Sequence, residues 1–173
     1  SVQELEALLK LAETAVLTSQ GVPFIFAGDE VMRDKQGVGN SYNSPDEINA
    51  IDWHNKTSHR GVFDYVKGLI ALRKAHPAFR MGDADLIREH LEFLETPASN
   101  VVAFRLKGSP CNDSWINTTV VLNARTEPVK ISVPAGKYWV ACRDGKVDLI
   151  TGLGMIVGNQ LQVAPRSALI VHQ

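Results

Sequence analysis

The stretch from Gly21 to Trp53 reads GVPFIFAGDEVMRDKQGVGNSYNSPDEINAIDW. Its first part, Val22 to Ala27, is an unbroken apolar run bracketed by glycines, without alternation between apolar and polar residues. Such a run is typical of a strand that is buried on both faces, as in a parallel sheet. Ligands of parallel α/β folds bind on loops that leave the carboxyl ends of strands. Because the loop that follows is rich in Asn, Ser, Asp and Arg, the sequence predicts the functional site there.

Helices are predicted on both sides of this strand. Residues 2–18 carry apolar side chains at helical spacing, with Glu13 among the polar residues of the opposite face. Residues 58–76 repeat the pattern, and Pro77 ends the second helix. The order helix, buried strand, loop, helix amounts to one and a half βα units, which cannot close a sheet alone.

Beyond residue 80 the sequence has no helical periodicity and predicts short strands separated by turn signals. The predicted strands are 86–89, 91–95, 101–107, 118–123, 129–133, 138–142, 147–150, 155–157, 161–164 and 168–172. Strands at this spacing indicate an antiparallel sandwich or barrel, and alternation places Trp139 in its core. The fold class is therefore α/β plus all-β, with residues 1–80 as the α/β part and residues 81–173 as the all-β domain.

The composition narrows the classes of partner. A net charge of -1 gives no reason to expect nucleic acid or an anionic membrane, and no apolar run approaches the ~20 residues that cross a bilayer. The scattered histidines and the two cysteines, Cys111 and Cys142, lack metal-ligand spacing, so we expect no metal, no cofactor and two reduced thiols. The chain opens at Ser1 already in a helical pattern, which suggests a processed product or a fragment and leaves localisation open.

Several strings resemble one enzyme family. GVPFIFAGDE, residues 21–30, resembles the final barrel strand of α-amylase-type glycoside hydrolases. MRDKQGVGNSYNSPDEINAIDW, residues 32–53, resembles the following segment of type I pullulanases, the bacterial debranching enzymes of α-1,6-glucans. LIALRKAHPAFRM, residues 69–81, resembles their last barrel helix, and VAPRSALIVH, residues 163–172, the last strands of the β-sandwich domain after the barrel. Phe26 and Asp29 depart from the family, in which many members have His and Glu or Gln there.

The resemblance implies that residues 1–80 are the last helix-strand-helix of a (β/α)8 barrel and residues 81–173 a C-terminal β-sandwich. The parent reaction would be hydrolysis of α-1,6-glucosidic bonds in pullulan, glycogen or branched maltooligosaccharides. In this family the catalytic carboxylates lie on earlier barrel strands. We therefore expect no catalytic residue in this chain and no activity from the chain alone.

The resemblance also implies that Arg33 lies near the glucose-binding subsites, with Asp46 and Asn49 close by, while Tyr42 offers a ring for stacking on sugar. Each of these residues also has a purely structural alternative role. Tyr42 can be a packing lid, the loop amides and hydroxyls can be turn residues, and Arg33 can form a structural ion pair with Asp34, Asp46 or Asp52.

Asp29 and Glu30 are not expected to be a catalytic pair, because adjacent residues that leave a strand point to opposite sides and cannot flank one bond.

An alternative from another class is a stand-alone carbohydrate-binding or structural β-sandwich module, with Trp115 as a sugar-stacking residue or as a plug over the sandwich. A third is a neighbouring activity such as that of an isoamylase or α-glucosidase. An isolated fragment would expose a large apolar patch, so we predict self-association.

Overall fold

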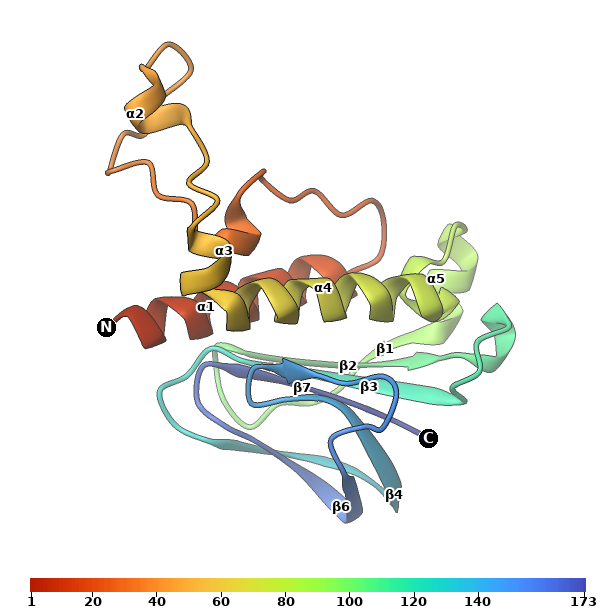
Figure 1. Ribbon diagram of the computed structural model, residues 1–173. Coiled ribbons are helices and arrows are strands. Elements are labelled where there is room, and N and C mark those ends of the chain that lie inside the picture. The colour runs from red at the N-terminus through yellow and green to blue at the C-terminus, as the bar shows by residue number, and fades with distance from the viewer.

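A computed structural model describes all residues, 1–173. A layer of helices covers one face of an antiparallel sheet, and a polar loop projects from the helical layer (Figure 1). The helices are α1 (Val2–Thr18), η1 (Asp29–Val31), α2 (Asp46–Asn49), α3 (Asn55–Ser58), α4 (Arg60–Ala75), η2 (Pro77–Arg80), α5 (Ala84–His90) and η3 (Ser109–Cys111). The strands are β1 (Leu91–Phe93), β2 (Val101–Lys107), β3 (Asn117–Asn123), β4 (Val129–Arg143), β5 (Lys146–Val147), β6 (Met155–Val163) and β7 (Ser167–His172). None of the helices combines the length and the apolar character needed to span a membrane.

The two long helices form where the sequence predicts them and pack against each other. α1 starts with a capping box, in which the Ser1 hydroxyl accepts from the Glu4 N–H and the Glu4 carboxylate reaches back to Ser1. At its other end Arg73 of α4, 7% exposed, donates to the carbonyl oxygens of Leu17, Ser19, Gly21 and Phe79. A guanidinium suits this position because it supplies several donors and a positive charge to unpaired carbonyls at a helix C-terminus. Arg73 thereby ties α1 to the end of α4.

The sheet is antiparallel throughout, with strand order β1-β2-β3-β7-β4-β5 and with β6 paired to β4. β4 pairs with β6 along most of its length and with β7 only near its end, from Trp139 onward. The first strands lie next to the helices, and β4 and β6 lie below them as a second layer (Figure 1). The predicted β-sandwich is thus present as one sheet that folds over on itself.

Both faces of the central strands are buried, which explains their continuous apolar sequences. In β3 Val120 belongs to a core of 16 residues shared with the helices, while its neighbour Val121 belongs to a core of 11 residues between the two strand layers. In β7 Ile170 and Val171 divide in the same way. Since successive side chains of a strand point to opposite faces, a run of apolar residues here means two cores rather than one.

Residues 22–27 form no strand, which corrects the prediction for the opening stretch. Val22 is 95% exposed and Phe24 is 86% exposed, and only Ile25 of this run packs against the helical core. A strand exists only when neighbouring strands accept and donate its backbone hydrogen bonds. All strands of this chain lie between residues 91 and 172 and pair with one another, so the apolar run has no partner.

Further predictions in the β domain are wrong in detail. β5 ends at Val147 rather than at residue 150, and β6 is one continuous strand where two, 155–157 and 161–164, were predicted. Residues 86–89 belong to helix α5, because the Asp83 carboxylate caps its first turn by accepting from the N–H groups of Asp85 and Leu86. Pro134 does not end a strand; it lies within β4 at a register shift between Ser132 and Gly136, where a proline leaves no ladder hydrogen bond unmade. Trp139 is 53% exposed, because its neighbour Tyr138 takes the inward position.

Candidate functional site

The loop between η1 and α4 carries the predicted site residues, and α2 lies at its far end (Figure 1). Gly28 lies directly before η1, and its φ of 103° is in the left-handed region. A Cβ at this position would lie 2.7 Å from Cδ of Arg33, so only glycine allows the chain to turn back and the Arg33 side chain to cross over it.

Arg33 joins the beginning of the loop to its far end. One guanidinium nitrogen donates to the carbonyl oxygen of Ala27 at 3.1 Å, and the other donates to the carbonyl oxygen of Asn49. The guanidinium carbon lies 5.2 Å from the centroid of the Phe26 ring, within the range of a cation–π contact. These bonds go to carbonyls, so the ion pair with Asp34, Asp46 or Asp52 that we considered from the sequence does not form. The third nitrogen, Nε, is buried without a hydrogen-bond partner.

Asn49 is the second centre of the loop. Its amide nitrogen donates to the carbonyl oxygens of Ser41 and Ser44, both at 2.7 Å, and its side-chain oxygen accepts from Lys35 Nζ at 2.6 Å. Together with the Arg33 contact these bonds fix both ends of α2. Asn49 therefore organises the backbone of the loop, a role the sequence analysis did not assign to it.

The four predicted residues divide into two pairs. Arg33 and Asn49 are brought together by a direct hydrogen bond. Tyr42 is 83% exposed and Asp46 is exposed at the start of α2, and no hydrogen bond links either side chain to Arg33 or Asn49. The exposed ring of Tyr42 excludes its role as a packing lid within this chain.

A hollow of about 540 Å³ lies between α1 and the base of the loop. Arg33 lines it together with Asp29, Asp34, Asn55 and His59, while the apolar side is formed by residues of α1. This volume is in the range of about 300–1,000 Å³ that is typical of small-molecule sites. The hollow offers charged and amide groups of both hydrogen-bonding kinds, which suits a polyhydroxylated ligand.

Carboxylates gather beneath the loop, and one of them was missed from the sequence. Glu13 of α1 is only 4% exposed, and its Oε2 has no hydrogen-bond partner. Burial, followed by the negative charges of Asp29 and Glu30, raises the pKa of Glu13. Burial also raises the pKa of Asp29, while Glu30 accepts from the Gly28 N–H at 3.0 Å. The helical pattern placed Glu13 on the solvent face, and no local signal distinguishes it from Glu4 or Glu6.

The chain does not assemble a metal centre, and Asp29 and Glu30 are not arranged as a pair of facing carboxylates. No group of three or more His, Cys, Asp or Glu side chains is arranged to hold a metal ion. Asp29 and Glu30 are consecutive residues of a short 3-10 helix, where the carboxylate of Glu30 is engaged with the backbone. The arrangement is one of binding groups on a loop.

The sequence of this chain is similar to those of debranching enzymes. Residues 87–146 match the family model "Pullulanase, all-beta domain". The pullulanase of Bacillus subtilis (strain 168) is 42% identical over 125 residues, which are 72% of this chain and 17% of that protein.

Solved structures extend the similarity to the helical part. The pullulanase from Bacillus acidopullulyticus superposes with a TM-score of 0.91 at 40% identity, over 97% of this chain and 20% of that one. The type I pullulanase from Bacillus subtilis, solved in complex with maltose, gives a TM-score of 0.91 at 33% identity, over 99% of this chain and 24% of that one. The chain thus spans between 17% and 24% of the length of these proteins. The predicted resemblance is confirmed: residues 87–146 match the pullulanase all-beta domain, and the chain as a whole is similar in sequence and structure to one part of the pullulanases.

Proposed function

We propose that this chain is the C-terminal portion of a type I pullulanase, in which it supports hydrolysis of α-1,6-glucosidic bonds in pullulan, glycogen or branched maltooligosaccharides. Residues 1–80 would complete a (β/α)8 barrel, and residues 81–173 would be the β-sandwich domain behind it. The reaction would proceed with retention, through two carboxylates about 5 Å apart on either side of the scissile bond. Those carboxylates would be supplied by the rest of the barrel, so the chain alone is expected to be inactive.

The observation that carries this proposal is the exposed apolar run Val22–Phe26 between two amphipathic helices. Beside it, Ile25, Phe63, Val66 and Ile70 line an apolar hollow of about 300 Å³ along α4. A self-contained carbohydrate-binding module would not be expected to leave such a surface exposed, because exposed apolar area of this kind favours association. A parallel strand of a barrel would pair the run on both edges and bury both its faces.

Within the complete enzyme the polar loop would form part of the sugar-binding cleft, since active sites of such barrels lie on the loops after the strands. Arg33 lines the hollow at the base of this loop and would donate to sugar hydroxyls through the terminal N–H groups that its two carbonyl bonds leave free, with Tyr42, Asp46 and Asn49 as neighbouring contacts. The Arg33–Asn49 bond supports this assignment, because it holds the loop in one conformation before a ligand arrives.

The test is a hybrid enzyme, in which this chain replaces the matching segment of the Bacillus subtilis pullulanase. We expect the hybrid enzyme to release reducing ends from pullulan, whereas a homogeneous sample of the 173-residue chain, verified by intact mass, releases none. A hybrid that folds but does not cleave pullulan would contradict the family role. Cleavage by the isolated chain would contradict its proposed inactivity and would make Asp29 and Glu30 the first residues to replace.

A further inference from the structure

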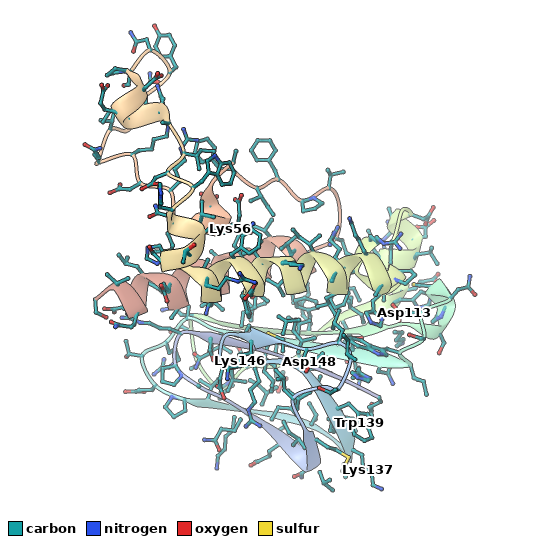
Figure 2. All side chains as sticks on the ribbon, in the orientation of Figure 1. Lys56, Asp113, Lys137, Trp139, Lys146 and Asp148 are labelled. Carbon is teal, nitrogen blue, oxygen red and sulfur yellow. The ribbon has the colours of Figure 1, made fainter.

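A second hollow lies on the β-sandwich, on the opposite side of the helical layer from the polar loop. Its volume is about 320 Å³, and its floor is the outward face of β4, where Trp139 is 53% exposed. Trp139 stands in register with Met155 of β6 and with His172 of β7, so the side chains of these three residues lie on the same face of the sheet. Trp139 lies on β4 and Asp148 in the loop beside it, whereas Lys56 lies at the base of the polar loop on the other side of the helical layer (Figure 2).

One wall of the hollow is the loop 148–154, which is bonded to the strand beside Trp139. The Asp148 N–H donates to the carbonyl of Ala141 at 3.0 Å, and the Leu153 N–H donates to the carbonyl of Val140 at 2.7 Å. The Val140 N–H in turn donates to the carbonyl of Gly154 at 2.9 Å. These three backbone bonds fix the wall relative to the indole, so the hollow is preformed.

The wall presents a carboxylate that stays charged. Asp148 accepts from the N–H groups of Ile150 and Thr151 at 2.8 and 3.0 Å and from the Thr151 hydroxyl at 2.6 Å. These bonds, that of the Thr151 hydroxyl first, lower the pKa of Asp148 to about 2. Because an ionised carboxylate has about four acceptor positions, one remains for a ligand hydroxyl.

The opposite wall is a stack of three rings. The Trp115 indole lies between the imidazoles of His76, at 3.5 Å between centroids, and His172, at 3.9 Å. Both faces of Trp115 are therefore covered, and it does not act as the sugar-stacking residue considered from the sequence. Burial and then the charge of His76 lower the pKa of His172 to about 4, so the imidazole that lines the hollow is neutral at neutral pH.

The chemistry of the lining selects the class of ligand. No Lys or Arg lines the hollow, and the one charged side chain is Asp148, so an anion is disfavoured. A free aromatic face beside a carboxylate acceptor fits a neutral molecule with an apolar C–H face and hydroxyls at its edge. A sugar ring has this character.

We propose that the Trp139 hollow is an accessory carbohydrate site that binds a short segment of α-glucan, with a glucosyl ring stacked on Trp139 and a hydroxyl donating to Asp148. That the sugar is an α-glucan rests on the proposed function. The site would hold a second part of a branched polysaccharide while the polar loop faces the cleavage point.

The chain contains three tryptophans, Trp53, Trp115 and Trp139, so a ¹⁵N-tryptophan sample gives three indole N–H signals by NMR. We expect titration of the full chain with maltoheptaose to shift the Trp139 signal saturably and the Trp115 signal less. Trp139→Ala should weaken binding by about tenfold, as loss of one stacking contact predicts, and Trp139→Phe should retain part of it. Phe93→Leu, which alters an exposed ring on β1 that lines neither hollow, is the matched control and should bind normally.

Titration without any shift of the Trp139 signal would overturn the inference, whether or not Trp53 responds. The same result with an active hybrid enzyme would leave the proposed function intact. Conversely, a saturable Trp139 shift that Asp148→Asn weakens, in a chain whose hybrid enzyme is inactive, would support the accessory site and contradict the proposed function. An equal response to a neutral non-carbohydrate aromatic ligand would also overturn the assignment to sugar.

Discussion

At the scale of the residue, the polar loop depends on a few side chains that bond to backbone. Arg33 donates to the carbonyl oxygens of Ala27 and Asn49, and the Asn49 amide nitrogen donates to two carbonyl oxygens of the loop. Replacing either residue would leave backbone carbonyl groups without a hydrogen-bond donor and would make the loop more mobile. Both residues therefore fix the conformation of the loop surface. Tyr42 and Asp46, which are exposed on the same loop, have no comparable structural role within this chain.

Among the loop residues, we expect replacement of Arg33 to reduce pullulan hydrolysis most. In the hybrid enzyme we expect Arg33→Ala to lower kcat/KM for pullulan by about 10- to 100-fold, the effect of losing one or two charge-assisted hydrogen bonds. Arg60→Ala is the matched control, because Arg60 is exposed on α4 and pairs only with Asp64. Steady-state kinetics would contradict the assignment if Arg33→Ala and Arg60→Ala were indistinguishable.

Glu13 should make stability depend on pH. Because its pKa is raised in the folded chain, the folded state keeps this proton to a higher pH than the unfolded state does, and stability falls as pH rises above the ordinary glutamate value. We expect Glu13→Gln to increase the free energy of unfolding at pH 7 by about 1 kcal/mol, the scale of a buried group without a partner, and to have little effect near pH 3. Urea unfolding at both pH values measures this. The exposed Glu47→Gln is the control, and an equal gain in both variants would contradict the role of burial.

At the scale of the element, close contact between α4 and the sheet sets a limit on side-chain size. Gly68 lies in α4 where a Cβ would meet Cβ of Val147 at 2.7 Å, so the helix approaches β5 without an intervening side chain. Glycine in a helix costs up to about 1 kcal/mol relative to alanine. Its presence in α4 is explained by this contact rather than by helix propensity.

Two glycines of the same helix should therefore respond in opposite directions to alanine. Gly68→Ala should lower the free energy of unfolding by about 1–3 kcal/mol, because the added methyl overpacks the contact with Val147. Gly61→Ala should raise it by up to about 1 kcal/mol, since the new Cβ would meet only Lys10 Nζ at 3.5 Å. Denaturant unfolding of both variants provides the comparison. Stabilisation by Gly68→Ala would show that α4 and β5 move apart at little cost.

At the scale of the whole molecule, the helical layer and the sheet share one core, while apolar side chains on the outer side of the helical layer are exposed. Leu69, Phe79, Leu106 and Ile170 are all fully buried in the shared core, which joins residues from both parts of the chain. On the opposite side of the helices Val22 and Phe24 project into solvent. The molecule is therefore well packed within the sandwich and against it, and incompletely covered on its outer helical surface.

This surface should drive self-association of the chain in isolation. We expect sedimentation velocity to show concentration-dependent dimers or larger species, and Phe24→Ser to shift the distribution toward monomer by removing exposed apolar area. Ile150→Ser is the control, because Ile150 is 96% exposed on the β-sandwich and remote from the run. A wild-type chain that stays monomeric over a wide concentration range would contradict the expectation.

The sequence by itself determined the two long helices, most of the strands and the resemblance to pullulanases, because these depend on local periodicity, caps and short strings of residues. It also identified the loop that carries Arg33 and Asn49. Only the tertiary structure decided that residues 22–27 lack strand partners, that Glu13 is buried and that Trp139, not Trp115, offers a free ring face. These outcomes depend on which segments lie next to one another in the folded chain. A local sequence pattern carries no information about which distant segments pack against it. Strand β4 is the clearest case. If its pairing register shifted by one residue, Trp139 would take the core position of Tyr138, and Tyr138 would take the surface position of Trp139.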